Sequence, residues 1–249
     1  MKRVLGIGGA VAMGAALLLA SPAGATPLDG PAGGASLAGA STVIQVPSDF
    51  VLGLSDTRAT GHYAVVGTGL RVWTEGSTST DKVAEYVATS TPLKDAGDTA
   101  LNYTATSGTT PPGAQLQVDI NGDGKADGIL VGEKVYNGDW WLSKSASAEF
   151  KAAAPLVGGG SGSDWHGTLA QWSASLPDAK VVAFGFSLGS SVKGDGVIDS
   201  ITFAGTDHTF AKDVTLTSKN ECKNGGWATS TKPVYRNQGD CVSSFASGK

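Results

Sequence analysis

The sequence predicts a mainly β protein, an antiparallel β-sandwich of jelly-roll-like type with one short helix. The 249 residues include 36 glycines and only 16% charged residues, a composition typical of many short strands and turns. In Gln115–Ile120 and Lys180–Leu188, side chains alternate between apolar residues and smaller or polar ones. Strands with one dry and one wet face are typical of antiparallel sheets. Only Gly167–Asp178 has the apolar spacing of a helix.

Apolar segments recur at short intervals along the chain, separated by Gly, Ser, Thr and Asp. The predicted strands are His62–Val66, Gly69–Thr74, Val83–Ala88, Gln115–Ile120, Ile129–Tyr136, Trp140–Leu142, Lys180–Leu188, Val197–Phe203 and His208–Leu216. Val83–Ala88 fits a short helix equally well, because a plausible cap precedes it. In Lys180–Leu188, we expect Val182 to share the core face with Phe184 and Phe186, opposite Val181.

The first 25 residues have the pattern of a secretory signal peptide. A basic pair precedes an apolar run from Val4 to Ala20, and Ala23-Gly24-Ala25 is a small-x-small cleavage site. A retained anchor is the alternative, but the run is short for a transmembrane helix. Cleavage would begin the mature chain at Thr26 and change its net charge from −4 to −6. We therefore expect a secreted, extracellular protein that binds neither nucleic acid nor, after cleavage, the membrane.

Three further regions follow the signal peptide. Residues 26–42 are small and lack periodicity, which predicts a flexible leader. Residues 43–216 contain the predicted strands and form the β-sandwich domain. Residues 217–249 form a tail that contains both cysteines, Cys222 and Cys241. Outside the cytoplasm such a pair is normally oxidised, so we expect a disulfide, with free thiols as the alternative.

Residues 118–132, "VDINGDGKADGILVG", are rich in oxygen ligands. The candidate ligands are the side chains of Asp119, Asn121, Asp123 and Asp127 and the carbonyl of Lys125. Ca²⁺ takes six to eight oxygens, which a tight loop can present at alternate positions. The alternative is a polar turn in which these residues cap their own backbone. Because three carboxylates in one short loop would repel one another without a counter-ion, the sequence predicts bound Ca²⁺.

Two segments resemble known proteins. The spacing D-x-N-x-D-G-x-x-D before an apolar strand resembles the calcium loops of FG-GAP repeats in integrin-type propellers. That resemblance covers residues 119–130 and implies a calcium-stabilised hairpin, but not a propeller, because repeated blades are missing. The tail "KNECKNGGWATSTKPVYRNQGDCVSSF" resembles the two-cysteine tails of uncharacterised secreted proteins from Gram-positive bacteria. This second resemblance supports secretion and a Cys222–Cys241 disulfide, and implies no activity.

A candidate ligand surface follows the calcium loop. The dipeptide Asn-Gly at 137–138 predicts a two-residue hairpin turn between Ile129–Tyr136 and the strand that contains Trp140. In that register Trp140 faces the core. Trp141 would then share the opposite face with Lys134 and Tyr136, a mixed surface suited to a sugar or a polar partner.

Two catalytic arrangements are conceivable but are not expected. "GFSLG" at 185–189 matches the nucleophile elbow, with Ser187 as nucleophile and His208 as base. Asp195 or Asp199 could orient that base, but a loop stands where the elbow needs a helix. The acids that could supply a glycosidase pair are Glu75, Glu85, Glu133 and Glu149.

The function expected from these features is extracellular binding. The leading hypothesis is a secreted, calcium-stabilised β-sandwich that acts as a binding or surface and matrix protein, with a polysaccharide or a cell-surface component as partner. A secreted hydrolase, using Ser187 or a carboxylate pair, is the second hypothesis. A purely structural extracellular protein is the third.

Overall fold

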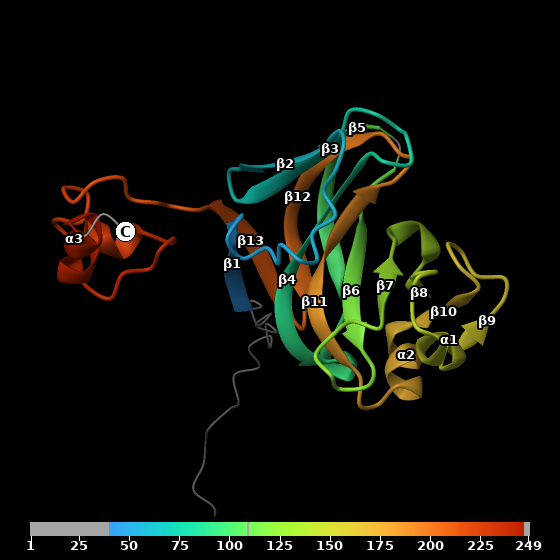
Figure 1. Ribbon diagram of the computed structural model, residues 1–249. Helices are drawn as coiled ribbons and strands as arrows, with labels where there is room; N and C mark the ends of the chain where they lie inside the picture. Colours follow the sequence, from blue (N-terminus) through green and yellow to red (C-terminus); the bar gives the residue numbers. More distant parts are fainter. Residues whose placement is uncertain (1–39, 109, 247–249) are drawn as a thin grey trace, which may run out of the picture. The chain divides into compact units, whose positions relative to one another are not determined.

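The computed structural model describes residues 40–108 and 110–246, which form two sheets (Figure 1). The predicted signal peptide and nearly all of the predicted leader lie outside the described residues. The protein is mostly β, with few helices, and the predicted β-sandwich class is confirmed. Among the described residues, no helix has the length and apolar character needed to cross a bilayer.

The six-stranded sheet is built around its longest strand, β12. Its strands are β1 (Ala40–Val46), β2 (Gly61–Val66), β3 (Gly69–Thr74), β5 (Ala100–Gly108), β12 (Gly194–Phe203) and β13 (Thr206–Lys212). One edge of β12 pairs with β3 and then with β13, while its other edge pairs with β5. β2 pairs with β3 and β1 with β13. The β1–β13 pair is parallel, a departure from the purely antiparallel sandwich expected.

The seven-stranded sheet is antiparallel throughout and has the order β4-β11-β6-β7-β8-β10-β9. Its strands are β4 (Lys82–Pro92), β6 (Gly113–Asp119), β7 (Gly128–Gly132), β8 (Asp139–Leu142), β9 (Leu156–Val157), β10 (Trp165–Thr168) and β11 (Lys180–Gly189). The segment Val83–Ala88, ambiguous in the sequence, lies in β4. It forms a strand because it pairs with β11, and such tertiary contacts outweigh the weak local preference of a short apolar segment.

The helices are short and lie outside the two sheets. They are α1 (Ala148–Ala152), α2 (Leu169–Ser175), α3 (Gln238–Ala246) and the 3₁₀ turns η1 (Leu93–Asp95), η2 (Lys134–Tyr136) and η3 (Gly226–Thr229). α2 is the predicted helix. A reciprocal capping box joins Thr168 and Gln171 at its start. Its buried Trp172 donates from the indole nitrogen to the carbonyl of Trp140 at 3.0 Å, which ties α2 to the edge of the sandwich.

The core lies between the sheets. The prediction that Val182 faces this core is wrong. A β-bulge at Val182 shifts the register, so Val181 is the core residue there and Val182 is only partly buried. An extra residue reverses which side chains face inward. Phe184 and Phe186 point into the core as expected.

The prediction that one face of β6 is exposed to solvent is also wrong. Gln115 and Gln117 are only 8% and 7% exposed. Tyr86 of β4 is opposite Gly185 of β11, and Gly185 is opposite Gln115. Because Gly185 has no side chain, Tyr86 can reach across it, and its hydroxyl donates to Gln115 Oε1. A polar residue on a strand can therefore be buried when its hydrogen bond is supplied.

The C-terminal segment has its own small core. Cys222 and Cys241 form the predicted disulfide. The side chains packed around it are Leu216, Trp227, Tyr235, Val242 and Phe245. This core is separate from the large hydrophobic cluster between the sheets.

Replacing Trp140 with alanine should destabilise the fold by about 3–5 kcal/mol, because a large buried ring is lost and leaves a cavity. Trp140 is 5% exposed, and its ring lies on Gly132. Urea unfolding measures the change. Val135→Ala, at a side chain that is 64% exposed, is the control and should change stability by less than about 0.5 kcal/mol. Equal effects of the two substitutions would show that Trp140 does not support the core.

Candidate binding cleft and calcium loop

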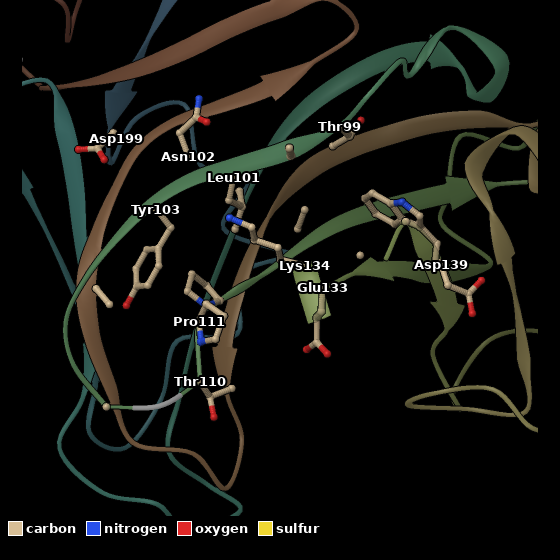
Figure 2. A pocket seen from close by; sticks show the side chains of 18 of the residues that line it. Thr99, Leu101, Asn102, Tyr103, Thr110, Pro111, Glu133, Lys134, Asp139 and Asp199 are labelled. Atoms are coloured by element: carbon tan, nitrogen blue, oxygen red, sulfur yellow. The ribbon is translucent and has the colours of Figure 1, made fainter. Parts of the chain in front are cut away.

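A cleft of about 790 Å³ opens between the two sheets along β5 (Figure 2). One wall is the inward side of β5, with Leu101, Tyr103 and Ala105. The other wall comes from β7 and β8, with Gly132 and Trp140. The cleft thus joins segments that are about 30 residues apart in the chain.

The cleft exists because the two sheets end at different places. β5 is an edge strand of the six-stranded sheet and lies next to β6 of the facing sheet. Beyond β6, the seven-stranded sheet continues with β7, β8, β10 and β9. Past β5, the inward side of β7 and β8 is covered mainly by Phe150 of α1 and Trp172 of α2 rather than by a strand, and the cleft opens only at the end near Gly132.

Side chains of β5 alternate between the cleft and the opposite face. Leu101 and Tyr103 contact the hydrophobic core. Asn102 donates to Ser200 Oγ at 2.6 Å, and Figure 2 shows it pointing away from the cleft. Thr104 donates to Asp199 Oδ2 at 2.8 Å on the same outer face. Asp199 therefore borders the cleft only at its outer edge, and its carboxylate already accepts the hydrogen bond from Thr104.

Trp140 forms an apolar wall of the cleft. A Cβ atom at Gly132 would lie 2.5 Å from the indole atoms of Trp140, so the glycine lets the ring lie flat on β7. Opposite it, burial and then the charge of Asp195 raise the pKa of Tyr103. Its phenol therefore stays protonated at neutral pH and can donate a hydrogen bond to a ligand.

Charged groups line the rim of the cleft. Asp139 Oδ2 lies 2.8 Å from His166 Nδ1, which directs this carboxylate toward β10. Burial, and then Glu133, raise the pKa of Tyr136, to which Glu133 is hydrogen-bonded. Lys134 is exposed and forms no ion pair with any described residue. Its ammonium group is therefore available to an incoming carboxylate.

The predicted hairpin register is wrong, and this separates the three predicted ligand-binding residues. The 3₁₀ turn η2 occupies residues 134–136, so β7 ends at Gly132, which pairs with Trp140. Trp141 pairs with Val131 and points to the other face, where Gly162 packs on its ring. Asn137 and its following glycine do adopt positive φ, as expected, but within a longer connection. Of the three residues, Lys134 lines the cleft, Tyr136 lies in η2, and Trp141 lies on the opposite face.

The predicted calcium loop folds as a network of side-chain to backbone hydrogen bonds. Asp119 Oδ1 accepts from the backbone N–H groups of Asn121 and Gly122, at 3.0 and 2.7 Å. Its Oδ2 accepts from the N–H of Gly124 at 2.8 Å. Further along, Asn121 accepts from the N–H of Asp123 at 2.9 Å, and Asp123 from that of Lys125 at 2.8 Å. Asp127 Oδ2 accepts from the N–H of Ile120 at 2.9 Å.

These bonds match the alternative to a calcium site, a polar turn in which Asp and Asn side chains cap their own backbone. In the part of the chain that the structure describes, no three acidic, histidine or cysteine side chains are gathered as a metal cluster. The donors are hard oxygens at alternate positions, so their type fits Ca²⁺, but they are directed to backbone N–H groups. Within the loop, the side-chain amide of Asn121 also donates to Asp127 Oδ1 at 3.2 Å.

Asp119 is only 2% exposed. Burial alone would raise the pKa of its carboxyl group. The hydrogen bonds from the N–H groups of Gly122, Gly124 and Asn121 together outweigh this effect, so the pKa of Asp119 lies below its ordinary value. Asp119 is therefore ionised at neutral pH and holds the loop through charge-assisted bonds.

The proposed esterase triad is not assembled. Ser187 lies within β11, paired with Ala84 and Gly113, rather than on a turn. His208 belongs to the other sheet, where its Nδ1 lies 2.7 Å from Oγ1 of Thr42 on the neighbouring strand β1. Asp195 is held by Arg71 at 2.7 and 2.9 Å. The candidate base and one of its candidate orienters thus already have other partners.

The four candidate glutamates are also dispersed. Glu85 is buried and accepts from Ser55 and Thr57. Glu75 lies 3.4 Å from His62. The other two are on α1 and at the rim of the cleft. A glycosidase pair drawn from this set has no support in the geometry.

Sequence reasoning missed the β5 wall of the cleft. The segment "ALNYTATSG" was not among the predicted strands, although Leu101, Tyr103 and Ala105 alternate with polar residues. That alternation was the available signal, but its apolar residues are too few to stand out from a loop. Comparisons of the chain with protein-family models, curated proteins and solved structures find no match.

Asp119→Asn should destabilise the protein at neutral pH and much less in acid. Because the folded pKa of Asp119 is lowered, its contribution to stability is present above about pH 4 and is lost as the pH falls toward the folded value. The difference in Tm between the wild type and the variant should therefore shrink from pH 7 to pH 2. The exposed Asp98→Asn serves as control. A difference that is constant with pH would contradict this role of Asp119.

Proposed function

We propose that this protein is a secreted, calcium-stabilised β-sandwich that binds a cell-surface or matrix component in the cleft along β5. The observation that carries the proposal is the cleft itself. The fold leaves an apolar recess with a phenol and an unpaired ammonium group at its border, an arrangement typical of ligand sites.

Secretion is supported by the signal-peptide pattern of the first 25 residues and by the Cys222–Cys241 disulfide. Disulfides persist in oxidising environments and are rare in the cytoplasm. Calcium is supported by the type and spacing of the oxygens in residues 119–127, for which Asp119, Asn121, Asp123, Asp127 and the Lys125 carbonyl would be the ligands. Bound Ca²⁺ would offset the negative charge of the loop and fix the start of β7, which forms one wall of the cleft.

The alternatives have less support. A hydrolase would need converging catalytic groups, and the described candidates have other partners. A polysaccharide on the face of Trp141 would need Lys134 and Tyr136 beside it, but the observed register separates them. A purely structural protein would not need the recess. A ligand screen with soluble cell-wall glycans and peptides therefore separates the hypotheses, with hydrolysis of the bound compound as the sign of an enzyme.

Substitutions in the cleft should weaken binding of the compound that the screen identifies. Tyr103→Ala removes a wall and a hydrogen-bond donor, and Lys134→Ala removes the charge at the rim. Each should cost about 1.4–2.8 kcal/mol, or roughly tenfold to a hundredfold in Kd measured by calorimetry. Lys94→Ala, on η1, is the control and should leave Kd unchanged. If Tyr103→Ala and Lys134→Ala both bind like the wild type, the ligand site lies elsewhere.

Calcium should raise the melting temperature. A ligand that binds only the folded state adds RT ln(1 + [L]/Kd), about 2.7 kcal/mol at a hundredfold excess over Kd. Asp123→Ala should abolish the rise, while Asp178→Ala, at an exposed residue outside the loop, should retain it. A melting curve that responds to neither calcium nor chelator would leave residues 119–127 as a polar turn.

A further inference from the structure

The free edge of β5 has only one of the usual protections of an edge strand, a β-bulge at Thr106 near its end. β5 has nine residues, none of them charged and none a proline. Among the described strands it pairs only with β12. Proteins normally guard such an edge with lysine, proline, a short strand or a covering segment, because its unpaired N–H and C=O groups accept another strand. Here the edge runs beside the cleft.

The facing sheet provides a platform for one more strand. Beyond β5, the cleft is bordered by Gly132 and by the edge of the largely buried Trp140 ring that lies on it. A strand added to β5 would lie above this platform, in the position that the six-stranded sheet leaves empty. Neighbouring strands are about 4.8 Å apart and packed sheets about 10 Å apart, so the added strand would be held on two sides.

We propose that an extended peptide of a partner protein binds by adding to β5 as a further strand of the six-stranded sheet. This inference rests on the proposed binding function and names the chemical class of the ligand. Main-chain hydrogen bonds to β5 would supply affinity. Specificity would come from every second side chain, which would point into the cleft between the sheets.

The geometry of β5 limits the length of that peptide. A bulge at Thr106 interrupts the strand, because Ala105 is opposite Gly196 while Ser107 is opposite Asp195. A second register shift, at Asp199, lies on β12, so β5 has no extra residue within 100–105, and that stretch is about 20 Å long at the usual rise per residue. The recognised segment is therefore about six residues, with apolar side chains at alternate positions. An acidic residue near one end would meet the unpaired ammonium group of Lys134.

A second copy of this chain does not fit the edge. Two β5 strands paired antiparallel about a twofold axis would form one continuous sheet, with both seven-stranded sheets on the same side. Each copy would bring β7, β8, β10 and β9 beneath the other copy's β5. The two extensions would occupy the same space, so a single narrow chain is the occupant that fits.

A backbone-methylation scan tests the mode of binding. A library of random peptides about ten residues long is screened against the full mature chain, and the best binder is resynthesised with one N-methyl group at each position in turn. Methylation removes one N–H, and only alternate N–H groups of a strand face its partner. Affinity should fall about tenfold at every second residue of the central stretch and by less than about threefold between them.

Two neighbouring substitutions provide the matched variants on the protein. Ala105 lines the cleft, whereas Thr104 points to the outer face, and both are exposed. Ala105→Trp should lower peptide affinity at least tenfold, while Thr104→Trp should not change it. Unchanged melting temperatures establish that both variants fold. Hydrogen exchange should show that alternate amides of residues 101–105 gain protection in the complex.

The outcomes separate this inference from the proposed function. A period of two in the methylation scan, with protection of β5 amides, supports strand addition. A cleft that binds a soluble cell-wall glycan but no peptide overturns strand addition and leaves the binding function standing. Strand addition is also overturned if neither N-methylation of the peptide nor Ala105→Trp changes the peptide affinity. If neither class of compound binds the cleft, both proposals fail.

Discussion

The arrangement of the sandwich depends on the hydrogen-bonding capacity of β12. One edge of this strand is long enough to pair with β3 and then with β13, so its other edge alone is left for β5. β5 thereby becomes the last strand on its side. The facing sheet has no equivalent limit, because β7, β8, β10 and β9 are added in turn beyond β6, each paired antiparallel with its neighbour. The difference in width between the sheets, and the cleft, follow from this pairing.

The sequence predicts those parts of the fold that depend on local patterns. β3 has the bounds expected, and α2 begins at a capping box that its residues encode. The burial of Leu116 and Val118 follows from their alternation. These features need only a strand or helix period and a core to face, so a single sequence is enough to indicate them.

The features that the sequence did not predict depend on partners distant in the chain. The polar face of β6 is buried because Tyr86 reaches Gln115 across Gly185, which no local pattern encodes. The bulge at Val182 and the longer connection before Trp140 each change which side chains share a face. The candidate site differs most from the prediction, because the observed pairing of Gly132 with Trp140 shifts the register by an odd number of residues and so exchanges the two faces of one strand.

The candidate calcium loop shows how one set of residues can satisfy two interpretations. Asp and Asn at alternate positions are required for a hard cation and are equally suited to capping their own backbone. The hydrogen bonds of Asp119 use the same oxygens that a cation would need. The local sequence therefore specifies the shape of this loop, but it does not specify whether a cation is bound there.

The disulfide of the C-terminal segment has a consequence for proteolysis of the chain. Cys222 and Cys241 are 19 residues apart, and the segment between them is largely exposed. Such segments are common targets of proteases. A cut within this loop would leave the two pieces covalently joined, and α3 would stay attached to the rest of the chain. The molecule can therefore be nicked there without losing its end, until a reductant separates the fragments.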